Sequence, residues 1–395
     1  MIFYSLSTVF FRNLADDELR INGNDVFLVG ENGQGKTNFL EALYFAAFGS
    51  SFRGAKDAEM AKTGEKSYSV RVKIGPAGGK DPGLLCREVQ IKYEKDKKTV
   101  LLDGKRVEDR RDLLSVVPCI VFCHEDMEFV AGSPERRRWF FDQSLSLCDG
   151  LYLEDLRNYR RILKSRNAVL REGNGRFSAK VLDALDPQLI IYGLKLIEQR
   201  ERAVELFSDL FGPLYREVAG IEGITIRYLP SWKFRTLDAG AAFLAERREA
   251  DSSAGLSLSG PHRDRYVFYR GNEEFAAKAS TGQRRLLALL LRAAQARRFS
   301  GITGENPVLL LDDVLLEMDG EKRRRFLSVM PAYDQAFYTF LPEEPYAHYI
   351  RGGRGGVHGS GTGSGGPETG GDRQTGTLVY YVENGALRGK DETGG

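Results

Sequence analysis

The sequence predicts an α/β protein whose parallel sheet carries an antiparallel β insert and an inserted α-helical domain. Three observations lead to this prediction. A short apolar run at residues 27–29 ends in a glycine-rich loop and leads directly into a helical pattern. Short alternating runs within residues 69–107 are typical of antiparallel strands. From Ser133 onward, apolar residues recur at helical spacing over roughly a hundred residues, enough for an independent core.

Residues 30–37 match the Gly-x-x-x-x-Gly-Lys-Thr pattern of a phosphate-binding loop. The predicted order of strand, loop and amphipathic helix is the context that turns this pattern into a site, and it disfavours a simple glycine turn before a surface helix. The loop glycines are expected to take backbone angles closed to other residues, so that amide groups surround an anion at the helix N-terminus. We expect the loop residues Gly30, Glu31, Asn32, Gly33, Gln34, Gly35, Lys36 and Thr37 to bind the nucleotide.

Two side chains of this loop have expected chemical roles. Lys36 is expected to contact the β and γ phosphates, and the Thr37 hydroxyl is expected to ligate Mg²⁺. Apolar residues at helical spacing follow the loop and predict an amphipathic helix that ends near Phe48. These apolar residues are Phe39, Leu40, Leu43, Tyr44 and Ala47.

Composition places the chain among ordinary globular proteins, since 42% of its 395 residues are hydrophobic and 28% are charged. The 57 Lys and Arg residues nearly balance the 55 Asp and Glu residues, so nucleic-acid binding would depend on local basic patches. The four cysteines form no C-x-x-C pair, and neither a signal peptide nor a long uncharged apolar run is present. We therefore expect a cytoplasmic protein without a membrane partner.

The first third of the chain predicts strands. Residues 2–11 read as a first strand, and residues 69–74, 87–93 and 99–102 read as an antiparallel insert with a hairpin at Asp103-Gly104. Cys119 and Cys123 lie in or just after an apolar strand, so a core position is favoured over a metal site with His124. A solvated face is favoured over DNA contact for the basic residues of the insert, Lys92, Lys95, Lys97, Lys98, Lys105 and Arg106.

The helical domain begins at Ser133-Pro134, where Ser is expected to cap the helix and Pro to occupy its first position. Two further long amphipathic helices follow. The basic residues of this helical domain form either a DNA-binding patch or a solvated face, and the sequence leaves both possibilities open. The two basic groups are Arg136, Arg137 and Arg138, and then Arg157, Arg160, Arg161, Lys164 and Arg166.

The last third of the chain contains two further motifs. Ser280-Thr281-Gly282-Gln283 precedes a long helix that is apolar nearly all round and is expected to be buried. Residues 307–311 form a continuous apolar run, typical of a parallel strand covered on both faces, which ends at Asp312 and Asp313. Functional residues lie at the carboxyl ends of such strands, so we expect both acids to lie where the phosphate loop opens.

The predicted domain organisation has five segments. Residues 1–130 and 256–350 form the two parts of one lobe, and residues 131–255 form the inserted helical domain. Residues 351–376 are rich in Gly and read as a flexible linker. Residues 377–395 contain a terminal β-hairpin, with a turn at Asn384-Gly385, that is expected to fold back onto the sheet of the phosphate loop.

The phosphate loop, the Ser-x-Gly-Gln sequence at 280–283 and the Asp-Asp pair after the apolar strand together resemble the head domains of ABC-type ATPases. Other details resemble the RecF family of bacterial DNA repair proteins more closely. These are the sequences at 260–264 (Gly-Pro-His-Arg-Asp) and 132–134 (Gly-Ser-Pro), the arginines at 136–138, and Asp-Asp where Asp-Glu is usual. The resemblance covers residues 1 to about 341 and the terminal hairpin.

The resemblance implies an ABC-type head and a weak DNA-dependent ATPase that dimerises on ATP and recognises gapped or junction DNA. RecR and RecO are the implied partners, and RecA is the recombinase that they help to load. In the implied catalytic site, Lys36 contacts ATP, Asp312 holds the Mg²⁺ shell, and Asp313 positions the attacking water. The residues implied to complete the ATP site of the partner subunit are Ser280, Gly282 and Gln283.

Three other functions are compatible with a phosphate-binding loop. A transporter ATPase is disfavoured because the interval from Lys36 to Ser280 is long and contains the β insert and the helical domain. A chromosome organiser of the SMC type needs a sustained heptad coiled coil, which the sequence lacks. A DNA clamp that uses ATP binding only as a switch stays open as an alternative to a working enzyme.

Overall fold

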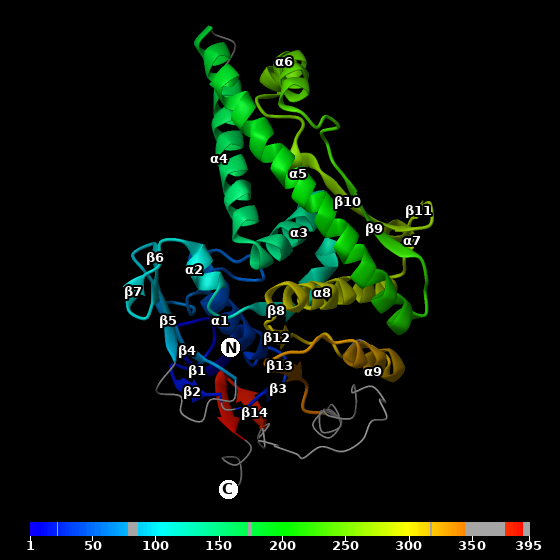
Figure 1. Cartoon of the computed structure of the whole chain (residues 1–395). Coiled ribbons are helices and arrows are strands. Elements are labelled where there is room, and N and C mark those ends of the chain that lie inside the picture. The colour runs from blue at the N-terminus through cyan, green and yellow to red at the C-terminus, as the bar shows by residue number, and fades with distance from the viewer. Residues whose placement is uncertain (22, 78–85, 173–175, 317, 344–375, 390–395) are drawn as a thin grey trace, which may run out of the picture. The chain divides into compact units, whose positions relative to one another are not determined.

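The computed structural model describes residues 1–395 except 22, 78–85, 173–175, 317, 344–375 and 390–395 (Figure 1). The chain divides into two compact units. The first contains Met1–His124, Asn306–Met318 and Ala332–Gly395, and the second contains Glu125–Glu305 and Asp319–Pro331. Apart from Gly376, the expected linker at 351–376 lies outside the described residues. The division into five segments stays a prediction. The second compact unit contains residues 256–305 together with the helical domain.

The sheet of the first unit that carries the phosphate loop has the strand order β15-β14-β3-β13-β12-β8. Neighbouring strands from β14 to β8 run parallel, and only β15 is antiparallel to its neighbour. The prediction that the terminal hairpin joins this sheet is confirmed, since β14 pairs with β3. The strands are β3 (Asp25–Val29), β8 (Cys119–Phe122), β12 (Val308–Leu311), β13 (Gln335–Phe340), β14 (Thr377–Glu383) and β15 (Ala386–Gly389).

A second, antiparallel sheet has the order β2-β1-β4-β5-β6-β7 and confirms the predicted β insert. The first strand of the chain belongs to this sheet, where β1 pairs with β4. The Gln335 side chain, buried at the start of β13, accepts from Phe3 N at 2.9 Å and donates to Phe3 O at 3.1 Å. The strands are β1 (Ile2–Val9), β2 (Glu18–Arg20), β4 (Tyr68–Gly75), β5 (Arg87–Glu94), β6 (Lys97–Leu102) and β7 (Lys105–Arg106).

Helix α1 (Lys36–Phe48) follows the phosphate loop as predicted, but it is not amphipathic. Its buried residues lie on all sides of the helix, because strands of both sheets contact it. The expectation of one exposed face is therefore wrong, and the buried set includes one carboxylate, Glu41. Two short helices complete the described part of this unit, the 3-10 helix η1 (Asp57–Met60) and α2 (Arg110–Leu114).

The second unit is mainly helical. The predicted start of its first long helix is confirmed, because the Ser133 side chain accepts from Arg136 N and Pro134 lies in the first turn. Strand β9 pairs antiparallel with β10, which pairs with β11. The helices are α3 (Pro134–Cys148), α4 (Gly150–Glu172), α5 (Arg176–Ala219), α6 (Leu237–Ala254), α7 (Phe275–Lys278), α8 (Thr281–Thr303), α9 (Gly320–Ser328), and the 3-10 helices η2 (His124–Phe129) and η3 (Pro261–Arg263). The strands are β9 (Ile224–Leu229), β10 (Arg265–Arg270) and β11 (Glu273–Glu274).

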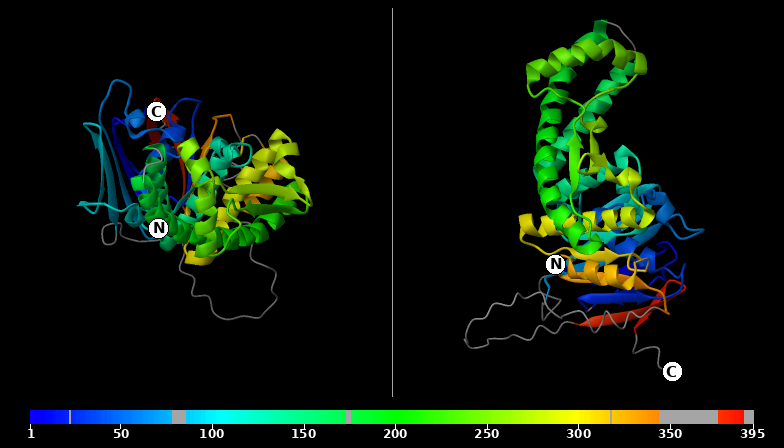
Figure 2. Two further views of the ribbon diagram at one scale, coloured as in Figure 1. Left: turned by 90° about the horizontal axis from the view of Figure 1, so that it is seen from above. Right: turned by 90° about the vertical axis from the view of Figure 1, so that its right-hand side faces the viewer.

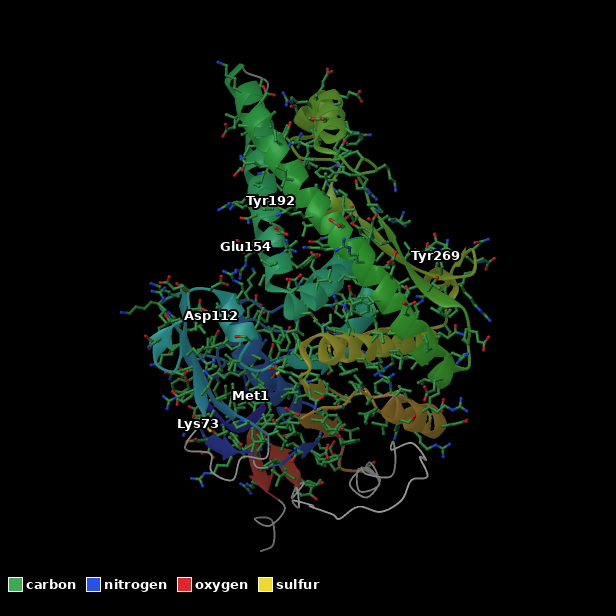
Figure 3. The ribbon with its side chains drawn as sticks, in the orientation of Figure 1. Met1, Lys73, Asp112, Glu154, Tyr192 and Tyr269 are labelled. Carbon is green, nitrogen blue, oxygen red and sulfur yellow. The ribbon has the colours of Figure 1, made fainter. Side chains whose placement is uncertain are left out.

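Helices α4 and α5 lie side by side and form the core of this unit with α6 (Figures 1 and 2). Tyr152, Leu156 and Trp232 belong to the buried apolar cluster between them. In Figure 3, Glu154 marks α4 and Tyr192 marks α5, and the partly buried Tyr192 ring packs against the same cluster. Among the described helices, none combines the length and the apolar character that a membrane span needs.

Candidate nucleotide-binding site

The phosphate loop connects the end of β3 to the first turn of α1. Gly33 has φ 81° and Gly35 has φ 116°, so both take the left-handed backbone angles that the sequence predicted. Gly30 differs from the prediction, because its φ is not positive. A Cβ atom at Gly30 would instead overlap the carbonyl oxygen of Val382 in β14. Glycine is therefore required at position 30 for the close approach of a neighbouring strand.

Lys36 lies inside the curve of the loop with only 4% of its surface exposed. Its Nζ donates to Gly30 O at 2.6 Å and to Glu31 O at 3.1 Å. The side chains of Glu31 and Asn32 are exposed at the tip of the loop. The ammonium group is thus held by two backbone carbonyls of a loop that leads into the N-terminus of a helix, and helix N-termini are where proteins bind phosphate.

The two acids after β12 have different surroundings. Asp312 Oδ1 accepts from Thr37 Oγ1 at 2.8 Å, so the end of β12 and the first turn of α1 meet as predicted. Asp313 has φ 51°, which is uncommon for a residue with a side chain. Thr339, near the end of β13, holds it there: the Thr339 hydroxyl accepts from Asp313 N at 2.7 Å and donates to Asp313 Oδ1 at 2.7 Å.

Hydroxyl and carboxylate oxygens such as Thr37 Oγ1 and Asp312 Oδ1 are the ligands that Mg²⁺ prefers. The ion is commonly held by one or two carboxylates together with substrate phosphates and water, so a larger protein cluster is not needed. Within the described part of the chain, no three His, Cys, Asp or Glu side chains are grouped to bind a metal. Cys119 and Cys123 are buried and not joined in a disulfide, as the core interpretation predicted, and burial raises the pKa of Cys119.

A cleft of about 580 Å³ opens beside Asn38, the residue that follows Thr37. Arg12 and Arg53 line it, and both are oriented by the buried carboxylate of Glu41 on α1. Arg12 Nε donates to Glu41 Oε2 at 2.9 Å, and Arg53 and Ser51 also donate to this carboxylate. Burial alone would raise the pKa of Glu41, but the hydrogen bonds from Arg53, Arg12 and Ser51 outweigh it and lower the pKa.

The Ser-x-Gly-Gln sequence lies in the second unit and opens α8, as predicted. Ser280 and Gln283 form a capping box: Ser280 Oγ accepts from Gln283 N at 3.3 Å, and Ser280 N donates to Gln283 Oε1 at 2.9 Å. Gly282 is exposed, and a Cβ atom built on it would meet nothing within 4 Å. Neither backbone angle nor packing within the described residues explains why glycine occupies this position.

The motif at 260–264 has an internal role in the second unit. Asp264 is fully buried and accepts from Arg200 Nη1 at 2.9 Å, from Ser231 N at 2.8 Å and from the Tyr228 hydroxyl. Arg200 also donates to Asp142 at 2.7 Å, so one buried guanidinium joins α5 to α3 and to this motif. Burying an unpaired charge costs free energy. The ion pairs of Arg200 with Asp264 and Asp142 leave none of these three charges unpaired.

Several arginines of the expected basic patch are not free surface charges. Arg166 is fully buried and pairs with Asp186 and Asp251 at 2.7 Å each, so its assignment to the patch is wrong. Arg137 donates to the carbonyl oxygen of Tyr266 in β10, and Arg138 donates to that of Asp264, the residue before β10. Helical spacing could not reveal these internal partners. The exposed basic residues of α4 are Arg160, Arg161, Lys164 and Arg171, with Arg157 partly buried.

Sequence reasoning missed Thr339, Glu41 and Asn13 as parts of the site. Thr339 had a signal, because a polar residue near the carboxyl end of a parallel strand lies at the edge where functional groups gather. Glu41 also had one, since it is a carboxylate among the apolar residues of a predicted buried helix. Asn13, whose Nδ2 donates to Gly33 O at 3.0 Å, follows the first strand in a turn without any recognisable pattern.

A parallel sheet with a phosphate loop and two acids at its edge, together with a helical unit that carries Ser-x-Gly-Gln, defines the head of an ABC-type ATPase. The solved structures agree. The recombination mediator protein RecF with ATP, in the RecFOR pathway, superimposes with a TM-score of 0.81 over 98% of this chain and 97% of that one, at 24% identity. An Smc head bound to the C-winged helix domain of ScpA gives 0.52 at 13% identity, over 98% and 96%.

Comparison of sequences identifies the family. The DNA replication and repair protein RecF of Treponema pallidum is 43% identical over 346 residues, 88% of this chain and 96% of the relative. The RecF protein of Moorella thermoacetica is 34% identical over 313 residues, 79% and 82% of the two chains. No protein-family model matches the chain. The chain belongs to the RecF family of DNA replication and repair proteins, as its motifs predicted.

The buried carboxylate of Glu41 generates the first prediction. Glu41→Gln removes the negative charge between Arg12 and Arg53, so the free energy of unfolding should fall by about 3 kcal/mol. Urea denaturation followed by circular dichroism measures it, with Glu65→Gln, a substitution at an exposed glutamate, as the control. An unchanged unfolding midpoint for Glu41→Gln would show that the ion pairs contribute nothing to stability.

Proposed function

We propose that this chain is an ATP-dependent DNA-binding protein of recombinational repair and replication-fork maintenance, with a weak ATPase activity that DNA stimulates. One observation carries the proposal. The hydrogen bond of 2.8 Å between Thr37 Oγ1 and Asp312 Oδ1 brings the phosphate loop and the end of β12 together across 275 positions of sequence. An ATPase of this class needs the two groups adjacent, since the hydroxyl and the carboxylate act on the same metal ion.

In this proposal the loop residues 30–37 bind the triphosphate through their amides, and Lys36 neutralises the β and γ phosphates. The cleft beside Asn38 receives the nucleoside end of ATP, because it continues from the first turn of α1 and offers polar groups. Arg12 and Arg53, held by Glu41, supply positive charge at its wall. ATP and not a smaller anion is proposed, since the loop and the cleft together match an extended polyanion with a polar group at one end.

Thr37 and Asp312 would hold Mg²⁺, which when bound supplies positive charge beside the phosphates. Asp313 would orient the attacking water and accept its proton. The left-handed backbone of Asp313 and its two hydrogen bonds with Thr339 keep its carboxylate in one position. The catalytic residues proposed are therefore Lys36, Asp312 and Asp313, with Thr339 as a positioning residue.

Ser280, Gly282 and Gln283 are proposed to complete the ATP site of a second copy of the chain. The exposed glycine supports this role, since nothing within the described residues of its own chain explains it. A residue without a side chain at the N-terminus of a helix lets a phosphate approach the amide groups closely. ATP would then act as the bridge of a homodimer.

DNA is the proposed macromolecular partner, with gapped duplexes and junctions as the preferred forms. The exposed cations of α4 are candidate phosphate contacts, which implies binding that weakens with salt and depends little on base sequence. RecR and RecO are proposed partners because the most similar fold described above is named as part of the RecFOR pathway, and RecA loading is proposed with them. We propose that the protein acts in the cytoplasm, consistent with four cysteines that form no disulfide among the described residues.

Removing the charge of Asp312 and removing that of Asp313 are predicted to affect ATP binding and turnover differently. Asp313→Asn should lower ATP turnover by about a hundredfold with little change in ATP affinity, because it removes the proton acceptor. Asn tolerates a left-handed backbone and can still accept from Thr339, so the fold should be kept. Asp312→Asn should lose Mg²⁺-dependent binding as well as turnover.

Steady-state hydrolysis and ATP titrations, each with and without gapped DNA, measure both variants beside the wild type. Normal turnover in Asp313→Asn would remove that residue from the reaction. A wild-type protein that binds ATP and DNA without any turnover would instead favour the alternative function, a DNA clamp in which ATP binding alone is the switch.

The dimer proposal predicts a position-specific effect of a large side chain. Gly282→Arg should leave ATP binding by the monomer intact and abolish ATP-induced dimers, because Arg would fill the space proposed for the partner's phosphates. Gly301→Arg is the matched control, since Gly301 lies in the same helix and also has nothing within 4 Å of a built Cβ. Light scattering with ATP measures the mass. Normal dimers of Gly282→Arg would contradict the proposal.

A further inference from the structure

The turn of the C-terminal hairpin contacts the phosphate loop directly, although 350 positions of sequence separate the residues. Asn384 N donates to Gln34 Oε1 at 2.6 Å, and Gly385 N donates to Gln34 O at 2.9 Å. On its other side, Gly385 O accepts from Ala15 N at 2.9 Å. The turn therefore lies between the loop and the segment that follows β1.

Only glycine fits at position 385. Its φ is 80°, and a Cβ atom there would overlap the carbonyl oxygen of Asn13 and lie 2.9 Å from Leu14 Cα. The turn also includes Asn384 at φ 50°, and consecutive positive φ values are typical of a tight type I′ hairpin turn. The fit is thus set by backbone atoms, which cannot move aside as the end of a flexible side chain can.

Asn13 holds the loop residue before Gln34. Its Nδ2 donates to Gly33 O at 3.0 Å, while its Oδ1 accepts from Asn38 Nδ2 at 2.7 Å. The carbonyl groups of Gly33 and Gln34 are therefore both held, the first by Asn13 and the second by the hairpin.

These hydrogen bonds determine where the loop amides point. In a trans peptide the C=O and the N–H point in opposite directions. Because the Gln34 carbonyl is held on the hairpin side, the N–H of Gly35 points to the opposite side. The Gly33 carbonyl orients the N–H of Gln34 likewise, and this N–H donates to Glu31 O at 3.4 Å within the loop. Amides fixed in this way form an anion site without further ordering of the backbone when the anion binds.

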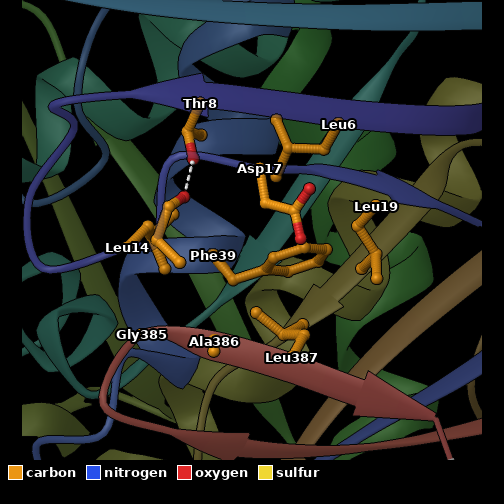
Figure 4. A pocket seen from close by; sticks show the side chains of 10 residues that line it. Leu6, Thr8, Leu14, Asp17, Leu19, Phe39, Gly385, Ala386 and Leu387 are labelled. Carbon is orange, nitrogen blue, oxygen red and sulfur yellow. Dashed lines mark hydrogen bonds between the residues drawn. The ribbon is translucent and has the colours of Figure 1, made fainter.

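Close packing keeps the hairpin in place. In Figure 4, Leu387 and Ala386 of the hairpin face Phe39 of α1, with Leu14 beside them. The space between these side chains is only about 30 Å³, too small for a ligand other than water. This apolar contact lies next to the pairing of β14 with β3, and β3 is the strand that leads into the phosphate loop.

We infer that the C-terminal hairpin, residues 377–389, is a positioning element of the ATP site, in which Asn384 and Gly385 hold the loop at Gln34 with its amides facing the phosphates. The inference rests on the proposed ATP binding and deepens it by naming what controls the affinity. ATP affinity then depends on the docking of the hairpin turn against the loop.

A pair of matched substitutions tests the inference. Gly385→Ala and Gly104→Ala both place a Cβ in the second residue of a tight turn, with φ 80° and 76° respectively. Only Gly385 has neighbours; a Cβ on Gly104 would meet nothing within 4 Å. ATP affinity, measured with a fluorescent ATP analogue and Mg²⁺ well below the unfolding temperature, should fall about tenfold or more for Gly385→Ala and change by less than about twofold for Gly104→Ala.

Equal affinities of the two variants would overturn the inference. If Gly385→Ala does not fold, hydrogen exchange on the wild-type protein decides the question. ATP should then slow exchange at the amides of Asn384 and Gly385 as well as in the loop, with the turn at Asp103-Gly104 as the internal reference. Slower exchange in residues 30–37 alone would overturn it. A wild-type protein that binds no ATP would refute the proposed function itself.

Discussion

The structure of the first unit depends on one constraint: the backbone amides of a short glycine-rich loop must face the same side. A loop with two left-handed glycines has many backbone conformations in isolation, and fixing each residue costs on the order of 1 kcal/mol. Two other segments restrict it, the turn after β1 through Asn13 and the C-terminal turn through Gly385. The loop is therefore shaped by contacts formed only when distant parts of the chain have folded together.

The order of strands in the parallel sheet follows from the same constraint. Strand β3 leads into the loop and lies between β14, which belongs to the C-terminal hairpin, and β13, which carries Thr339. Strand β12, next to β13, brings Asp312 to the hydroxyl of Thr37. Each neighbour of β3 thus contributes a group to one edge of the sheet, as expected for the carboxyl ends of parallel strands.

In both units, buried charged side chains fix the orientation of the side chains that pair with them. Glu41 on α1 directs two arginines toward the cleft, and Arg200 in the second unit is held by Asp142 and Asp264. Such pairs add little net stability compared with apolar packing, but removing one partner is costly. They therefore define one arrangement of the side chains around them.

The sequence predicted those features that local patterns encode. The phosphate loop, the cap at Ser133, the buried strand before Asp312 and the antiparallel insert each leave a signature within a few residues. It could not predict the burial of Arg166, because its partners Asp186 and Asp251 lie on other helices. Nor could it predict why Gly30 is glycine, since the contact is with Val382 in a strand added at the far end of the chain.

The central claim is that the loop at 30–37 binds ATP, and a titration of Lys36→Ala tests it most directly. Lys36 lies within the loop with its Nζ on two loop carbonyls, so Lys36→Ala removes a buried cation from the proposed phosphate site. Calorimetric titration with ATP and Mg²⁺ should show saturable binding to the wild type and to the exposed control Lys73→Ala, and a loss of at least about tenfold for Lys36→Ala. Equal affinity of Lys36→Ala and the wild type would contradict the account.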